Sequence, residues 1–129
     1  KSKEGVLRMS EIMDNLLRHY MNQDVAVLHF NQETEKTEVV AYVSVNKNLS
    51  DNKKLEVAFE KTNNIDCAWW ENKEVEKAFK GGVCRSTSVG DVVRIEDKKY
   101  MCIPNGWKKI DNYPTSEEQT EWWRMREEV

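Results

Sequence analysis

The chain has 129 residues, a formal net charge of -3 and an apolar fraction of 39%, so it can hold one domain with a hydrophobic core but not two full domains. A charged fraction of 33% and a mean hydropathy of -0.80 predict a polar surface, and no apolar run is long enough to span a membrane. Because the sequence starts without the pattern of a signal peptide, we expect a cytoplasmic protein without a membrane partner.

Three cysteines and two histidines restrict the available chemistry. Cys67, Cys84 and Cys102 are odd in number and widely spaced, which fits neither a disulfide framework nor the close cysteine pairs of a zinc site. His19 and His29 belong to different predicted elements. We therefore expect reduced thiols, no metal ion and no cofactor.

Residues 1–21 are predicted to form an amphipathic N-terminal helix. Apolar side chains recur there at helical spacing and most charged residues fall on the opposite side. The apolar positions are Val6, Met9, Met13, Leu16, Leu17 and Tyr20.

A core domain of mixed α and β structure is expected over residues 22–110. It begins with two β-prone runs, 25–30 and 39–45, which are separated by a charged segment. A hairpin is the simplest connection between two such runs. A central helix follows, which Ser50 or Asp51 can cap, and we expect it to end at 63–64 and to pack on the hairpin.

The middle of the chain carries two adjacent tryptophans, Trp69 and Trp70. Adjacent side chains diverge on a helix or a strand, so one is expected in the core and the other at its rim. Apolar residues at Val75, Ala78 and Phe79 then predict a short helix that ends at glycines 81–82.

Short β-prone runs fill the rest of the core domain, and turn residues separate them. The runs lie at 83–85, 91–96, 100–103 and 107–110. The predicted fold class is α+β: a small antiparallel sheet or β-meander with an N-terminal, a central and a C-terminal helix packed around it.

Residues 111–129 are expected to form a linker and an acidic C-terminal helix. The run 116–119, Ser-Glu-Glu-Gln, matches the capping-box pattern that starts a helix. This helix carries Trp122 and Trp123 and is too short to be stable alone in water. It must therefore dock on its own domain or on a partner.

Two phrases of the core domain resemble a known family. They are Arg-Ser-Thr-Ser-Val-Gly-Asp-Val-Val at 85–93 and Tyr-Met-Cys-Ile-Pro-Asn-Gly-Trp at 100–107. Together they look like the C-terminal unit of the YodL-like family, small uncharacterised proteins of bacteriophages and mobile elements. The resemblance implies a bacterial host cell, and it brings no activity, cofactor or catalytic residue.

The first functional hypothesis is a non-catalytic phage or mobile-element protein that binds a host or viral protein, with a component of a defence system as one such target. Tryptophan and arginine are typical interface anchors. The predicted partner-binding residues are Trp69, Trp70, Arg85, Trp122 and Trp123. The alternative is that the terminal helices complete the protein's own core or a homodimer.

The second hypothesis is a small nucleic-acid-binding module. Basic side chains would line one face of the meander and a tryptophan would stack on bases. The predicted nucleic-acid face consists of Arg94, Lys98, Lys99, Lys108 and Lys109, with Arg85 beside them. A near-neutral core domain and an acidic tail count against this hypothesis.

Catalysis is not expected. The acids next to apolar sequence are Asp66, Asp91 and Glu96, and we expect the two aspartates to cap turns or helices. Cys84 beside Arg85 is the best nucleophile candidate, but each histidine belongs to a distant segment of the sequence.

Overall fold

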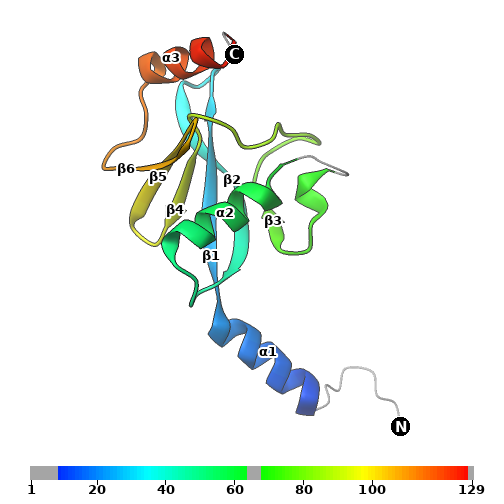
Figure 1. Ribbon diagram of the computed structural model, residues 1–129. Coiled ribbons are helices and arrows are strands. Elements are labelled where there is room, and N and C mark those ends of the chain that lie inside the picture. The colour runs from blue at the N-terminus through cyan, green and yellow to red at the C-terminus, as the bar shows by residue number, and fades with distance from the viewer. Residues whose placement is uncertain (1–8, 64–67, 128–129) are drawn as a thin grey trace.

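The computed structural model describes residues 9–63 and 68–127 and shows an α+β fold around one antiparallel sheet (Figure 1). The helices are α1 (Met9–Met21), α2 (Asp51–Lys61) and α3 (Ser116–Glu127), with a short 3-10 helix η1 (Trp69–Glu71). The strands are β1 (Asn22–Asn31), β2 (Lys36–Asn46), β3 (Val75–Lys77), β4 (Val92–Ile95), β5 (Lys98–Ile103) and β6 (Gly106–Ile110). Their order in the sheet is β3-β2-β1-β4-β5-β6, which confirms the predicted fold class with its three helices.

The predicted β1–β2 hairpin is confirmed, and β1 is one of the two central strands of the sheet. Residues 25–30 of β1 are all buried, because β1 lies between β2 and β4 and both of its faces are covered. The register shifts between Val27 and Leu28, where β2 contains one residue more. Such a bulge bends the strand and increases its twist.

The two faces of the sheet carry separate apolar clusters, since side chains alternate along a strand. On the face that we call the α2 face, Val27 and Val93 pack with Leu55 of α2 and with Trp69. On the opposite face, which we call the α3 face, Leu28 and Met101 form a second cluster, and half-buried Trp122 of α3 packs against it.

The predicted central helix is confirmed, and so is its cap. The side-chain oxygen of Ser50 accepts a hydrogen bond from the backbone N–H of Lys53 at 3.3 Å. The helix ends at Lys61 and Thr62 is its C-terminal cap, so it stops slightly before the predicted asparagines. Asp51 in the first turn binds Lys98 of β5 at 2.5 Å and ties the helix to the sheet.

Two predictions for the segment between α2 and β4 are wrong. Residues 75–77 form strand β3 and not a helix, because the open edge of β2 offers hydrogen-bonding partners at 41–43. Residues 83–85 form no strand, because their chain leaves the sheet and crosses towards the end of α2, where the N–H of Thr87 donates to the carbonyl of Thr62 at 3.0 Å.

The C-terminal helix docks on the sheet and its capping box lies one residue before the predicted position. The N–H of Glu118 donates to the hydroxyl of Thr115 at 3.2 Å, and the N–H of Thr115 donates to the carboxylate of Glu118 at 3.0 Å. Gln119 is buried and its amide donates to the carbonyl of Gly90 at 2.6 Å. These contacts fix α3 over the loop that precedes β4.

The N-terminal helix forms, but the prediction that it packs around the sheet is wrong, because its apolar side chains are exposed. Figure 1 shows α1 projecting away from the opposite end of the molecule from α3. Its last residue is held by a hydrogen bond from the N–H of Lys47 to the carbonyl of Met21 at 2.8 Å. Across residues 9–63 and 68–127, no helix combines the length and apolarity that a membrane crossing needs.

Candidate functional site

A cavity of about 1090 Å³ opens between the tip of the β1–β2 hairpin and the segment 78–85. Glu33 and Glu38 contribute to its hairpin side, whereas Lys80 comes from the opposite side. His29 and Cys84 also line this cavity. Its wall thus combines apolar side chains with charges of both signs, a thiol and an imidazole.

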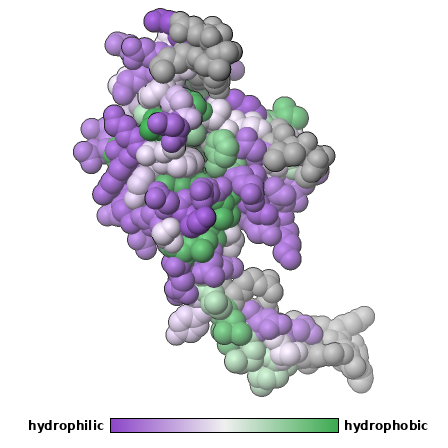
Figure 2. All heavy atoms as spheres, in the orientation of Figure 1, coloured by the Kyte–Doolittle hydropathy of each residue, from purple (hydrophilic) through white to green (hydrophobic). Residues whose placement is uncertain are grey.

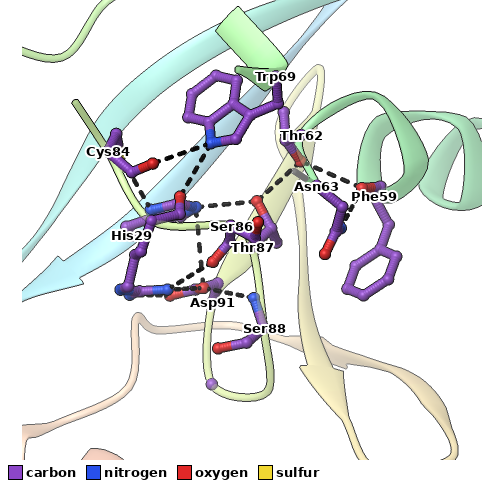
Figure 3. Close-up of polar contacts among 12 residues, drawn as sticks. His29, Phe59, Thr62, Asn63, Trp69, Cys84, Ser86, Thr87, Ser88 and Asp91 are labelled. Carbon is purple, nitrogen blue, oxygen red and sulfur yellow. Dashed lines mark hydrogen bonds and ion pairs between the residues drawn. The ribbon is translucent and has the colours of Figure 1, made fainter. Parts of the chain in front are cut away.

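The structure brings Cys84 and His29 together, although they are far apart in the sequence. The sulfur of Cys84 lies 3.6 Å from Nδ1 of His29, and Figure 3 shows the two residues next to each other. Sequence reasoning missed this pair because it placed each histidine in a segment distant from Cys84. The signal that could have found it is the pairing of β1 with β4, which carries the loop before β4 over the end of β1.

A chain of hydroxyl groups fixes the proton position on His29 (Figure 3). Nε2 of His29 lies 2.8 Å from the hydroxyl of Thr87, which lies 2.8 Å from the hydroxyl of Thr62. Thr62 donates its proton to the carbonyl of Ala58 at 2.7 Å. Thr87 must then donate to Thr62 and accept from His29, because each hydroxyl has one proton. Nε2 therefore carries the hydrogen, and the lone pair of Nδ1 faces the thiol.

Burial sets the charges of this pair. Desolvation lowers the pKa of His29 to about 4, although the carboxylate of Asp91 acts in the opposite direction. Desolvation also raises the pKa of the Cys84 thiol. At neutral pH the resting site is thus a thiol next to a neutral imidazole, and not a thiolate–imidazolium pair.

Arg85 and Asp91 form a bidentate ion pair that closes the loop between them. The two guanidinium nitrogens lie 2.6 and 2.8 Å from the carboxylate oxygens. Asp91 is buried and also accepts a hydrogen bond from the N–H of Ser88 at 2.8 Å. The predicted capping role of Asp91 is confirmed. Arg85, one of the predicted partner-binding residues, therefore already has an intramolecular partner in Asp91.

The two adjacent tryptophans divide into core and rim, as predicted. Trp69 is completely buried and Trp70 is half-buried, with their ring centroids 5.4 Å apart. The indole N–H of Trp69 donates to the carbonyls of Cys84 and Arg85 at 3.2 and 3.0 Å. The prediction that Trp69 contacts a partner or stacks on bases is wrong, because its ring has no exposed surface.

Of the two tryptophans on the C-terminal helix, Trp122 is half-buried against the α3 face of the sheet. It completes the protein's own second cluster, the alternative that the sequence left open. The side chain of Trp123 lies outside the described part of the structure.

The prediction that the basic residues form one face is wrong, because successive side chains of a strand point to opposite faces of the sheet. Arg94 pairs with Lys99 in the β-ladder, and these two side chains lie on the α3 face together with Lys108. Lys98 and Lys109 lie on the α2 face. The positive charge is therefore shared between opposite sides of the sheet.

No cluster of three or more metal-ligating side chains (His, Cys, Asp or Glu) occurs among residues 9–63 and 68–127. The predictions for Asp66 and Cys67 fall outside the described residues, as does the side chain of His19. Glu96 is exposed and adopts a positive φ of 57° in the β4–β5 turn.

The apolar side of α1 is a second candidate site. Seven of its large apolar side chains are exposed, as Figure 2 shows below the main body of the molecule: Met9, Ile12, Met13, Leu16, Leu17, Tyr20 and Met21. Their spacing places them along one stripe of the helix. A contiguous exposed apolar surface of this kind is typical of an interaction site.

No family model, no curated protein and no solved structure matches this chain.

Proposed function

We propose that this chain is a non-catalytic protein-binding module that inserts the apolar face of α1 into a hydrophobic groove of a partner protein. The resemblance to small phage and mobile-element proteins supports a host or viral partner in a bacterial cell. The single observation that carries the proposal is the exposed apolar stripe of α1, on a helix that the sheet does not cover.

A groove in another protein suits this helix better than a membrane surface or a second copy. Residues 9–21 contain Glu11 and Asp14 against Arg18, whereas helices that lie on anionic bilayers are rich in lysine and arginine. The described part of α1 has 13 residues and is about 20 Å long. A homodimer that pairs this stripe with the same stripe of a second copy would bury far less than the roughly 800 Å² per partner of a stable interface.

The composition of the stripe also favours a protein groove. Amphipathic helices in grooves use anchors at spacings of three, four and seven residues, and Met9, Ile12, Met13, Leu16 and Tyr20 have these spacings. Methionine side chains adapt to irregular apolar surfaces. The proposed interaction surface thus moves from the predicted tryptophans of the C-terminal helix to the N-terminal helix.

The test compares the tagged full chain with two variants in pull-downs from nuclease-treated bacterial lysate. Leu16→Glu with Leu17→Glu alters the apolar stripe, and Glu11→Gln with Asp14→Asn is the matched control on the polar side. The proposal requires a stoichiometric partner that the first variant loses and the control retains. Equal recovery with both variants would overturn it, and light scattering reports the alternative of a homodimer that the first variant dissociates.

A further inference from the structure

We propose that Cys84 is a site of thiol–disulfide exchange, in which His29 accepts the thiol proton and a small zwitterionic disulfide enters the adjoining cavity. This inference goes beyond the proposed protein-binding function and does not depend on α1. It rests on the Cys84–His29 pair, on the hydroxyl chain behind His29 and on the charges of the cavity.

The orientation of His29 is that of a general base for the thiol. Thr62 and Thr87 hold the hydrogen on Nε2, so that the lone pair of Nδ1 points at the sulfur 3.6 Å away. Rotation of the ring would break the hydrogen bond to Thr87, and Trp69 packs against the ring with the two centroids 6.4 Å apart. The imidazole is therefore preorganised for proton transfer from Cys84.

The charged groups around His29 allow it to carry a proton for a short time. Among the described residues, the titratable and charged groups that act on it are Asp91, Arg85 and Cys84. Oδ2 of Asp91 lies 3.8 Å from Nε2 and favours the imidazolium, whereas Arg85 opposes it. After the thiol proton has been transferred, the carboxylate of Asp91 thus stabilises the imidazolium of His29.

The cavity suits a ligand with both ammonium and carboxylate groups. Glu33 on the hairpin side can bind an ammonium group, and Lys80 on the opposite side can bind a carboxylate. Glu38, whose oxygens accept hydrogen bonds from Asn31 and Thr34, adds a second negative charge on the hairpin side. A volume of about 1090 Å³ accommodates a small-molecule ligand. Disulfides of small peptide or amino-acid thiols have these charges and carry a sulfur that a thiol can attack.

The exchange step balances without a further reagent. As the Cys84 sulfur attacks one sulfur of the disulfide, its proton passes to Nδ1 of His29. A new sulfur–sulfur bond forms while the original one breaks, and the leaving thiolate takes the proton back from His29. The Cys84 sulfur is oxidised to a mixed disulfide and the released sulfur is reduced to a thiol.

A pH profile distinguishes this mechanism from ordinary thiolate chemistry. The reactive form, a thiol with a neutral imidazole, is the dominant one from just above the His29 pKa of about 4 up to the raised pKa of the thiol. The rate at Cys84 should therefore be nearly flat between pH 5 and pH 7.5. A thiol without a base instead reacts about tenfold faster with each pH unit below its pKa.

The experiment treats the reduced full chain with iodoacetamide or oxidised glutathione and follows each cysteine by peptide mass mapping. Cys102 is the internal reference, since it is buried and desolvation raises its pKa to about 11. We expect a flat pH profile at Cys84 with both probes and a steep one at Cys102. His29→Gln should slow Cys84 at pH 6 by about 10- to 100-fold and restore the steep profile.

Two further variants keep the test informative. Thr87→Val removes the hydroxyl that anchors His29, so it should also slow the reaction of Cys84 and steepen its pH profile. It takes the place of His29→Gln in the test if that variant does not fold. Lys80→Ala should lower the ratio of the glutathione rate to the iodoacetamide rate, whereas Lys108→Ala on β6 is the matched control and should leave this ratio unchanged.

Three outcomes would each overturn the proposal: a steep pH profile at Cys84, wild-type rates at Cys84 in the His29 and Thr87 variants, or no mixed disulfide at Cys84. Because these rates do not involve α1, their failure leaves the protein-binding proposal standing.

Discussion

Gln119 of α3 lies directly against Gly90, to whose carbonyl its amide donates a hydrogen bond of 2.6 Å. Gly90 has a φ of +94°, and a Cβ built there would lie 2.5 Å from Oε1 of Gln119. One contact therefore joins the C-terminal helix to the turn that begins β4, and a side chain at position 90 would displace the Gln119 amide.

The first prediction is that Gly90→Ala strongly destabilises the domain. The positive φ and the clash with Gln119 should together lower the free energy of unfolding by about 2–4 kcal/mol. Urea denaturation followed by circular dichroism measures this. Gly82→Ala is the matched control, because a Cβ there meets nothing within 4 Å, and an equal loss in both variants would contradict the prediction.

The second prediction concerns acid stability. The pKa of His29 falls from 6.5 in the unfolded chain to about 4 in the folded protein, so the unfolded state binds its proton at higher pH. The stability that this neutral histidine contributes is present above pH 6.5 and is lost as the pH falls towards 4, by about 3 kcal/mol in total.

This prediction is measured by denaturation curves between pH 7 and pH 4 for the wild type and for His29→Gln. The variant should lose less stability over that window than the wild type does. Asp51 makes a separate contribution at lower pH, because its hydrogen bond from Lys98 lowers its pKa below 3.8. Parallel curves for the two proteins across the window would show that His29 is not the group responsible.

The third prediction is that Trp69→Phe destabilises the protein and loosens the loop before β4. The smaller ring leaves a gap in the core and leaves the carbonyls of Cys84 and Arg85 without their indole donor. We expect a loss of about 2–4 kcal/mol. Trp70→Phe removes a half-buried ring and should cost clearly less, as thermal melts of the two variants would show; the reverse order would contradict the assignment of core and rim.

The fourth prediction separates binding from folding at α1. Because Leu16 and Leu17 are 54% and 51% exposed, replacing both by glutamate should change the free energy of unfolding of the sheet domain by less than about 0.5 kcal/mol. Chemical denaturation monitored by tryptophan fluorescence gives this value. A loss of several kcal/mol would mean that α1 is part of the folded core.

Local patterns predicted the elements whose residues decide their own conformation. The β1–β2 hairpin and the cap at Ser50 follow from nearby side chains, and so does the division between Trp69 and Trp70. Strand β3 was missed because an open edge on β2 overrides the helical spacing of Val75, Ala78 and Phe79. Tertiary context, and not local propensity, decides such a short segment.

The candidate site was less predictable, because it depends on contacts between distant segments. Cys84 was singled out from the sequence, but its partner His29, 55 residues away, became visible only once β1 lay beside β4. The five basic residues of the predicted nucleic-acid face show the opposite error. Closeness in sequence suggested one surface, whereas the strand register sends them to two sides.

The pairing between β1 and β4 spans three positions, Ala26–Leu28 against Val92–Arg94, and it joins the N-terminal hairpin to the C-terminal strands. The hairpin β1–β2 and the strands β4–β6 each consist of neighbours in sequence and can form early. Joining them closes a loop of more than sixty residues, which is the slow kind of step in folding. Backbone amides at this junction should therefore gain protection from hydrogen exchange later than those within the hairpin, so that the Cys84–His29 pair assembles only in the last stage of folding.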